Sequence, residues 1–275
     1  MTVVLLSLAA AAFFGAMTVA IRFGLGGGDA AAGALAMLCS ATVVAAIASI
    51  VPHDYRGVWP FLLAGLLAPG CSQVLFTLSV REAGPSRTSV AVGAAPLLAV
   101  AIALVFLDEP VQAPLLAGAV AIVCGGLVLA VERDRPDHVR AVALLFAVGA
   151  AILFAVRDNV IRALHADANP ESAVTATLLA GTLVSLVWAR RLPHGGELRR
   201  LAPAGVLFGI SYICLFEAYF HGPVSVVSPL VATETLFALA LSALLLGRTE
   251  RVGARLALGA LLMVTGGILI GVSRA

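Results

Sequence analysis

The stretch GAVAIVCGG at residues 118–126 returns as GALLMVTGG at residues 259–267, 141 positions later. Further matches lie at a spacing of 140: Phe14 with Phe154, Ile21 with Ile161, Arg22 with Arg162, Gly65 with Gly205, Leu75 with Leu215, and Phe76 with Phe216. Spacings this constant indicate a duplicated unit whose copies differ by small changes in loop length. Chance similarity between helices rich in alanine and leucine is the alternative.

The composition excludes a water-soluble globule. The 275 residues are 61% hydrophobic and 12% charged, with a mean hydropathy of +1.07, whereas soluble domains carry about 25% charged residues. We therefore expect a multi-pass protein of the cell (inner) membrane, surrounded by the lipid bilayer. The net charge of +2 and the lack of a basic run give no reason to expect nucleic acid as a partner.

Ten stretches are long and apolar enough to cross the hydrocarbon core, which takes about 20 residues of helix. They lie near residues 3–22, 30–51, 59–80, 86–107, 112–131, 141–162, 172–189, 201–220, 224–246 and 253–272. The polar segment 132–138 separates a first repeat at 1–135 from a second at 136–275. Because each copy crosses an odd number of times, the second enters the membrane in the opposite direction. The predicted fold is an all-α membrane protein of ten transmembrane helices in two inverted five-helix repeats.

The cysteines and histidines show no pattern of metal ligands. The four cysteines, Cys39, Cys71, Cys124 and Cys214, lie far apart within apolar spans, where cysteine acts as a small packing residue. No pair has the spacing of a zinc site, and no phosphate-binding loop of the Walker type occurs. We expect no metal, no cofactor and no catalytic residue.

Several loose motifs along the chain are those of a known family. They are Phe14-Gly15 followed by Arg22, Pro96 followed by Glu109, the two glycine-rich stretches, and Glu234-Thr235. Through them the chain resembles the drug/metabolite transporter superfamily, specifically its ten-helix branch with two EamA-type repeats. The resemblance covers nearly the full length and implies a transporter rather than an enzyme. The chain departs from the family pattern at three positions, where Phe14 replaces a tryptophan, Thr235 a proline and Arg248 a glutamate.

Two arguments about orientation in the membrane disagree. Connectors after odd-numbered spans hold thirteen arginines: Arg22, Arg81, Arg87, Arg133, Arg135, Arg140, Arg190, Arg191, Arg199, Arg200, Arg248, Arg251 and Arg255. The opposite side holds Arg56, Arg162 and Arg274. The positive-inside rule places the thirteen in the cytoplasm and both termini outside, whereas the family resemblance implies cytoplasmic termini. Both orientations stay open.

Glu234 lies near the middle of the predicted span 224–246, between Thr233 and Thr235. A charged side chain at the bilayer centre costs about 2.5–3.5 kcal/mol on insertion scales, so such residues are usually functional. This carboxylate would bind a cationic group of a substrate or carry a coupling proton. A protonated glutamate bonded to a neighbouring helix is the structural alternative. Glu234 and Thr233 are therefore candidate substrate-binding residues.

The predicted helix 201–220 carries a second polar face. Cys214, Glu217 and His221 recur at helical spacing, with Tyr212 nearby. This face predicts either the wall of a polar cavity or an anchor at the membrane interface. If this face is the wall of a polar cavity, Glu217 and Tyr212 are further candidate substrate-binding residues.

The most polar cluster in any predicted span is Arg157-Asp158-Asn159 with Arg162. Asp158 and Arg162 are four residues apart and are expected to pair on one helix face, which would leave Arg157 free to meet a substrate carboxylate. The alternative is a helix end whose long side chains reach the interface. Arg157, Asp158 and Asn159 are candidate binding residues, while Arg162 and its repeat partner Arg22 are candidate gates or loop anchors.

These observations favour a secondary transporter, expected to be an exporter, of small metabolites such as amino acids, or of cationic drugs, by alternating access. The expected partners are a small-molecule substrate and a coupling proton or cation, and the expected oligomeric state is a monomer or weak homodimer. The alternatives are a channel and an intramembrane enzyme acting on lipid-linked substrates, which would need clustered catalytic groups.

Overall fold

The structure is a computed structural model that describes the chain except residues 26–28, 52–53, 84–91, 93–94, 111, 131–140, 167, 247–253 and 273–275. Most described residues lie in helices, and no strand occurs among them. They are α1 (Thr2–Leu25), α2 (Ala30–Ala48), α3 (Trp59–Gly65), the π-helical turn η1 (Leu66–Cys71), α4 (Ser72–Ala83), α6 (Ala95–Phe106), α7 (Ala113–Ala130), α8 (Ala141–Ala163), α9 (Pro170–Ala189), α10 (Gly195–His221), α11 (Val224–Val231), α12 (Glu234–Leu246) and α13 (Ala254–Val272).

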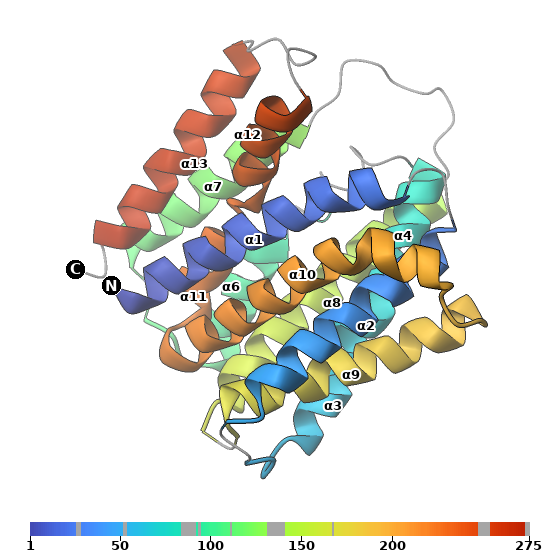
Figure 1. Cartoon of the computed structure of the whole chain (residues 1–275). Coiled ribbons are helices and arrows are strands. Elements are labelled where there is room, and N and C mark those ends of the chain that lie inside the picture. Colours follow the sequence, from blue (N-terminus) through green and yellow to red (C-terminus); the bar gives the residue numbers. More distant parts are fainter. Residues whose placement is uncertain are drawn as a thin grey trace.

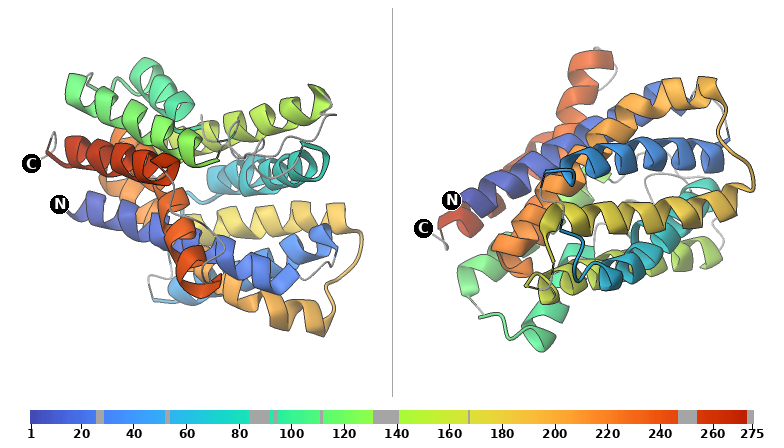
Figure 2. Two further views of the ribbon diagram at one scale, coloured as in Figure 1. Left: turned by 90° about the horizontal axis from the view of Figure 1, so that it is seen from above. Right: turned by 60° about the horizontal axis from the view of Figure 1, so that its bottom comes forward.

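Long apolar helices and an apolar outer surface make this an all-α membrane protein. Five described helical stretches are long and apolar enough to cross a bilayer: Thr2–Ile21, Ala31–Ala48, Trp59–Ser79, Pro170–Ala189 and Gly195–His221. Large apolar side chains such as Phe106, Val187 and Leu244 are more than three-quarters exposed, which suits lipid rather than water. Both termini lie at the same end of the helices (Figures 1 and 2).

The last helix of each repeat packs against its counterpart, as α7 beside α13 in Figure 1. A Cβ atom added to Gly118 would lie 2.7 Å from the carbonyl oxygen of Gly266, and one added to Gly125 would lie 2.7 Å from that of Gly259. Residue numbers at the contact therefore increase along α7 while they decrease along α13, so the two helices are antiparallel. Equivalent helices that run antiparallel are related by a two-fold axis in the membrane plane, which is the geometry of inverted repeats.

Contacts between the other helices repeat the same symmetry. Gly65 in α3 fits against the backbone of Thr177 in α9, and Gly205 in α10 fits against the backbone of Met37 in α2. Each contact becomes the other when 140 is added to one residue number and subtracted from the other. The hydroxyls of Thr42 and its counterpart Thr182 share a hydrogen bond of 2.8 Å, as expected for residues on the axis. The predicted inverted-repeat fold is confirmed.

Two predicted spans differ from single continuous helices. The span 59–80 contains η1, where Ala68 has the extended dihedrals φ −147° and ψ 122° before Pro69. The span 224–246 is interrupted between α11 and α12: the backbone N–H of Thr233 donates to Leu230, three residues back, and its hydroxyl donates to the same carbonyl at 2.6 Å. Pro229 lacks the N–H group and crowds the preceding turn, and a threonine hydroxyl that binds backbone carbonyls competes with regular helix.

Adjacent glycines in α7 provide a test of this packing. We expect Gly125→Ala to lower the unfolding free energy by about 1–3 kcal/mol, because its methyl would overlap the Gly259 backbone and overpacking costs that much. Gly126→Ala is the matched control, since a Cβ there meets nothing closer than 3.8 Å. Melting temperatures of the two purified variants in detergent measure the difference, and equal melting temperatures would contradict the close contact.

Candidate functional site

A buried ion pair lies on α8. Arg157 and Asp158 are 7% and 6% exposed, and the guanidinium donates from Nε (3.0 Å) and Nη2 (2.6 Å) to Asp158 Oδ1. Among the charged residues of the described chain, these two are the ones classed as buried. An isolated buried charge is costly, so such groups occur in pairs with further hydrogen bonds.

Aromatic residues enclose the arginine of this pair. Arg157 Nη1 donates to the hydroxyl of Tyr212 on α10 at 2.6 Å. The guanidinium carbon lies 5.5 Å from the ring centre of Phe154 and 5.3 Å from that of Tyr212. Both distances are within the range of cation–π attraction. Arg157 is therefore held by α8 and α10 together.

The second oxygen of Asp158 connects α8 to α11. Ser228 donates its hydroxyl to Asp158 Oδ2 at 3.3 Å, and the hydroxyl of Tyr219 also interacts with Asp158 and Ser228. The ion pair thus joins three helices of the second repeat. Ser228 and Tyr219 are not among the predicted site residues, because their role depends on contacts with α8 that the sequence does not record.

Asn159 links the cluster to the first repeat. Its Nδ2 donates to the carbonyl of Ala99 on α6 at 3.0 Å and to that of Ala155 at 2.9 Å. Its Oδ1 is buried and has no hydrogen-bond partner among the described residues. The structure therefore places Arg157, Asp158 and Asn159 together with Tyr212 at a meeting point of both repeats.

Glu234 is the first residue of α12, directly after the break in the ninth span. Its carboxylate is partly buried and makes no hydrogen bond or ion pair with another described residue. Arg157 is near enough to attract it electrostatically. A Cβ added to Gly15 would lie 2.8 Å from the Glu234 carbonyl oxygen, so this glycine lets α1 approach α12. Thr233 turns its hydroxyl to the Leu230 carbonyl instead of toward Glu234.

Glu217 lies apart from the central cluster. Its carboxylate is 3.4 Å from Nδ1 of the exposed His221, one turn further along α10. Glu217 and Tyr212 are five residues apart, which puts them about 140° apart around a helix, so the two side chains point to different faces. No hydrogen bond between described residues joins Glu217 to Arg157 or Asp158.

The predicted pairing of Asp158 with Arg162 is wrong. Arg162 Nη1 donates to the backbone carbonyls of Tyr219 and Phe220, at 3.1 and 3.2 Å. These carbonyls lie in the last turn of α10 and lack partners within their own helix, so they compete successfully for the guanidinium. Asp158 instead binds its neighbour Arg157, which is therefore not free. The side chain of Arg22 lies outside the described residues.

Glu109 forms a connection that was predicted only as a family motif. Its two carboxylate oxygens accept hydrogen bonds from the backbone N–H groups of Val224 (2.6 Å) and Ser225 (2.9 Å). A carboxylate there complements the unpaired donors and the positive dipole of a helix N-terminus. Glu109 and Arg162 thus hold the two sides of the α10–α11 turn, and both line a pocket of about 460 Å³ with His165.

The adjacent carboxylates at the end of the fourth span test this connection. We expect Glu109→Gln to lower stability by about 0.5–2 kcal/mol, the usual size of a helix N-terminal capping effect, because the amide keeps one acceptor oxygen but replaces the other by a donor and removes the charge. Asp108→Asn is the matched control, because Asp108 is exposed, has φ 50° and asparagine tolerates that conformation. Thermal unfolding of both variants measures the difference, and an equal effect would contradict the capping role.

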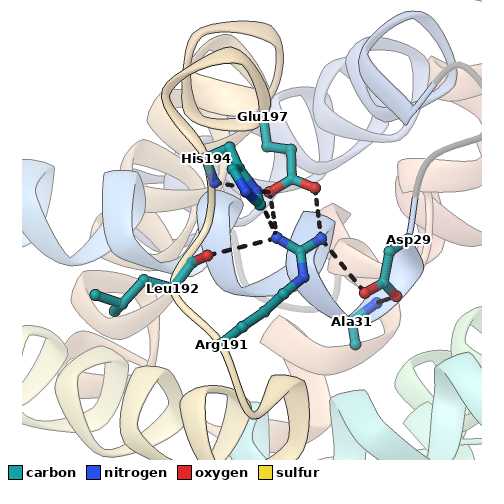
Figure 3. Close-up of polar contacts among 6 residues, drawn as sticks. All are labelled: Asp29, Ala31, Arg191, Leu192, His194 and Glu197. Carbon is teal, nitrogen blue, oxygen red and sulfur yellow. Dashed lines mark hydrogen bonds and ion pairs between the residues drawn. The ribbon is translucent and has the colours of Figure 1, made fainter.

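A polar network lies at the opposite end of α10, and Figure 3 shows its contacts. Arg191, after α9, donates to both oxygens of Glu197 at 2.7 and 2.9 Å and lies 3.5 Å from Asp29. Asp29 caps α2 by accepting from Ala31 N at 3.0 Å. Asn169, its repeat counterpart, caps α9 by accepting from Glu171 N in the same way. The spacing of 140 between Asp29 and Asn169 was the available sequence signal for this pair of caps.

Elsewhere the described chain has polar groups and pockets but no second buried ion pair. A second pocket, of about 530 Å³, lies between η1–α4 and α9 and is lined by apolar side chains with Cys71. Within the described ranges no three His, Cys, Asp or Glu side chains gather as a metal site would require. The cluster around Arg157, Asp158 and Glu234 is therefore the best candidate site.

Comparisons with known proteins agree with this architecture. The EamA-like transporter family matches the sequence twice, over residues 1–131 and 141–272. The chain belongs to the EamA-like transporter family. As a member of that family, it is a multi-pass membrane protein of a drug/metabolite transporter type.

The fold also has a counterpart of known structure. One solved crystal structure of a protein superposes with a TM-score of 0.87 at 17% identity, covering 98% of this chain and 96% of the other. Similarity at this level of identity shows the fold alone. A search of curated proteins finds no significant match.

Proposed function

We propose that this EamA-family member is a secondary transporter that exports small metabolites such as amino acids, or cationic drugs, by alternating access. The observation that carries the proposal is the location of its buried charges. Arg157, Asp158 and Glu234 lie where helices of two antiparallel repeats meet. Intramembrane charges of this kind usually mark a substrate or ion pathway.

The interrupted ninth span supports a binding site at this position. Transporters built from inverted repeats bind their substrates near the midplane, beside discontinuous helices. Here the break between α11 and α12 immediately precedes Glu234. Both ends of the surrounding helices carry polar connections, Glu109 with Arg162 at one end and the Arg191 network at the other. Breaking one set at a time would expose the centre to one side.

The remaining parts of the proposal concern coupling and location. The driving force would be a gradient of protons or another cation, with Glu234 as the group that binds the coupling ion or the substrate. We place the protein in the cell (inner) membrane, as a monomer or weak homodimer.

Counterflow in proteoliposomes tests the proposal. Liposomes containing the purified protein are loaded with one unlabelled candidate solute, and uptake of the same labelled solute is followed. A transporter that alternates between two states takes up labelled solute faster when unlabelled solute is present inside the liposomes. The reason is that the binding site returns to the outward-facing state more readily with solute bound than empty. Flux that is indifferent to the trans solute would indicate a channel, and conversion of an added lipid-linked precursor would indicate an enzyme.

A further inference from the structure

We propose that the central site selects solutes that carry an amine cation and an apolar or aromatic body but no carboxylate. This inference rests on the transport function proposed above and narrows its substrate class. Amino acids and cationic amines both contain a positive nitrogen, so the distinction between them depends on whether the site offers a partner for the carboxylate.

The arginine that would bind a carboxylate is already occupied. A guanidinium has five N–H donors, and three of those of Arg157 point to Asp158 and Tyr212. The rings of Phe154 and Tyr212 lie over the guanidinium at 5.5 and 5.3 Å. A substrate carboxylate that reached the two remaining N–H donors would be a second anion beside a guanidinium that Asp158 already neutralises. Burying that extra charge is unfavourable.

The charge balance of the cluster favours a cation. Arg157 and Asp158 neutralise each other at 2.6 Å, whereas the Glu234 carboxylate makes no hydrogen bond or ion pair with another described residue. The three side chains together therefore carry one negative charge when Glu234 is ionised. A bound ammonium group would neutralise this charge, while a zwitterion would bring a further, unpaired carboxylate to the same cluster.

An aromatic cluster that would suit an apolar body includes Tyr212, the hydrogen-bond partner of Arg157. The ring of Phe14 lies 5.8 Å from that of Phe208 and 5.9 Å from that of Tyr212, and the last two are 4.6 Å apart. Gly15, the next residue of α1, touches the backbone of Glu234. Figure 1 shows α1 between α10 and α12, so the ring cluster and the Glu234 backbone contact neighbouring residues of the same helix. Aromatic faces also attract organic cations directly.

Pairs of compounds that differ only in the carboxylate test the selectivity. We would compare 2-phenylethylamine with phenylalanine, and tyramine with tyrosine, by thermal stabilisation of the purified protein and by counterflow in proteoliposomes. An unpaired buried charge typically weakens binding on the order of 100-fold, so each amine is expected to bind at least that much more tightly than its amino acid. Stabilisation by the amino acids as strong as that by the amines would overturn the proposal, as would stabilisation by neither.

Two matched variants locate the selecting group. Glu234→Gln is expected to lose stabilisation by both amines, whereas Glu171→Gln, which alters a glutamate in the first turn of α9, retains it. Amine binding that survives in Glu234→Gln would overturn the assignment of this residue. The two proposals fail separately: transport of amino acids equal to amines rejects the selectivity alone, whereas amine binding without counterflow of any solute rejects alternating access.

Discussion

We expect Glu234→Gln to abolish gradient-driven transport while the protein still folds and inserts. Glutamine has nearly the same shape as glutamate, so the change removes the negative charge and the exchangeable proton without creating a cavity. In the proposed mechanism the Glu234 charge pairs with the bound substrate or coupling cation. Losing one partner of such a pair costs about 2–5 kcal/mol, which predicts initial uptake rates lower by a factor of about 30 or more. Uptake by reconstituted protein under an imposed proton or cation gradient measures the effect.

The accompanying controls separate function from folding. The melting temperature of Glu234→Gln should equal or exceed that of the original protein, because a partly buried carboxylate without a described partner does not stabilise the fold. Glu171→Gln should transport at the original rate. Original flux in Glu234→Gln would refute the role of its charge.

Asp158→Ala should produce the largest loss of stability among single substitutions at the site. Removing one member of a buried ion pair leaves the other uncompensated, at a cost of about 3–5 kcal/mol. The exposed fractions of 7% for Arg157 and 6% for Asp158 place the pair in that category. Unfolding in mixed micelles with increasing denaturing detergent measures the change.

A double substitution tests whether the unpaired arginine causes that loss. Arg157→Met combined with Asp158→Leu replaces both charges with apolar groups of similar volume, and most of the stability should return. The Tyr212 hydroxyl would lose its 2.6 Å contact with Arg157, so a deficit of about 1 kcal/mol is expected to remain. A double variant as unstable as Asp158→Ala would show that the loss has another source.

The architecture was predictable because it depends on features that a sequence records directly. Apolar length fixes the spans, and Gly118, Gly125 and Gly266 are needed where the backbones of α7 and α13 touch. The stretch that revealed the repeat is therefore the stretch through which the repeats make contact. The sequence also contains Pro229, but a proline alone does not predict a helix break at this position. The break depends in addition on the hydrogen bonds that Thr233 makes to Leu230.

The site was only partly predictable, because pairing depends on distances between helices. The sequence identified Arg157, Asp158, Tyr212 and Glu234 individually, since polar groups are rare in apolar spans. The sequence predicted the wrong partner for Asp158, because helical spacing compares residues within a single helix. It could not show that carbonyls of another helix, α10, accept the hydrogen bonds of Arg162. Ser228 and Glu109 act through contacts with other helices, which no spacing within a segment reveals.

The Arg191 network has a consequence for a protein made from two copies of one unit. Subtracting 140 from Arg191 and Glu197 gives Val51 and Gly57, and adding it to Asp29 gives Asn169. The two ends of the repeat structure therefore differ chemically. One end carries the exposed ion pairs of Arg191 with Asp29 and Glu197, and the equivalent positions at the other end carry no charge. Since dissolved salt weakens exposed ion pairs, the electrolyte on one side of the membrane will influence this molecule more than the same electrolyte on the other.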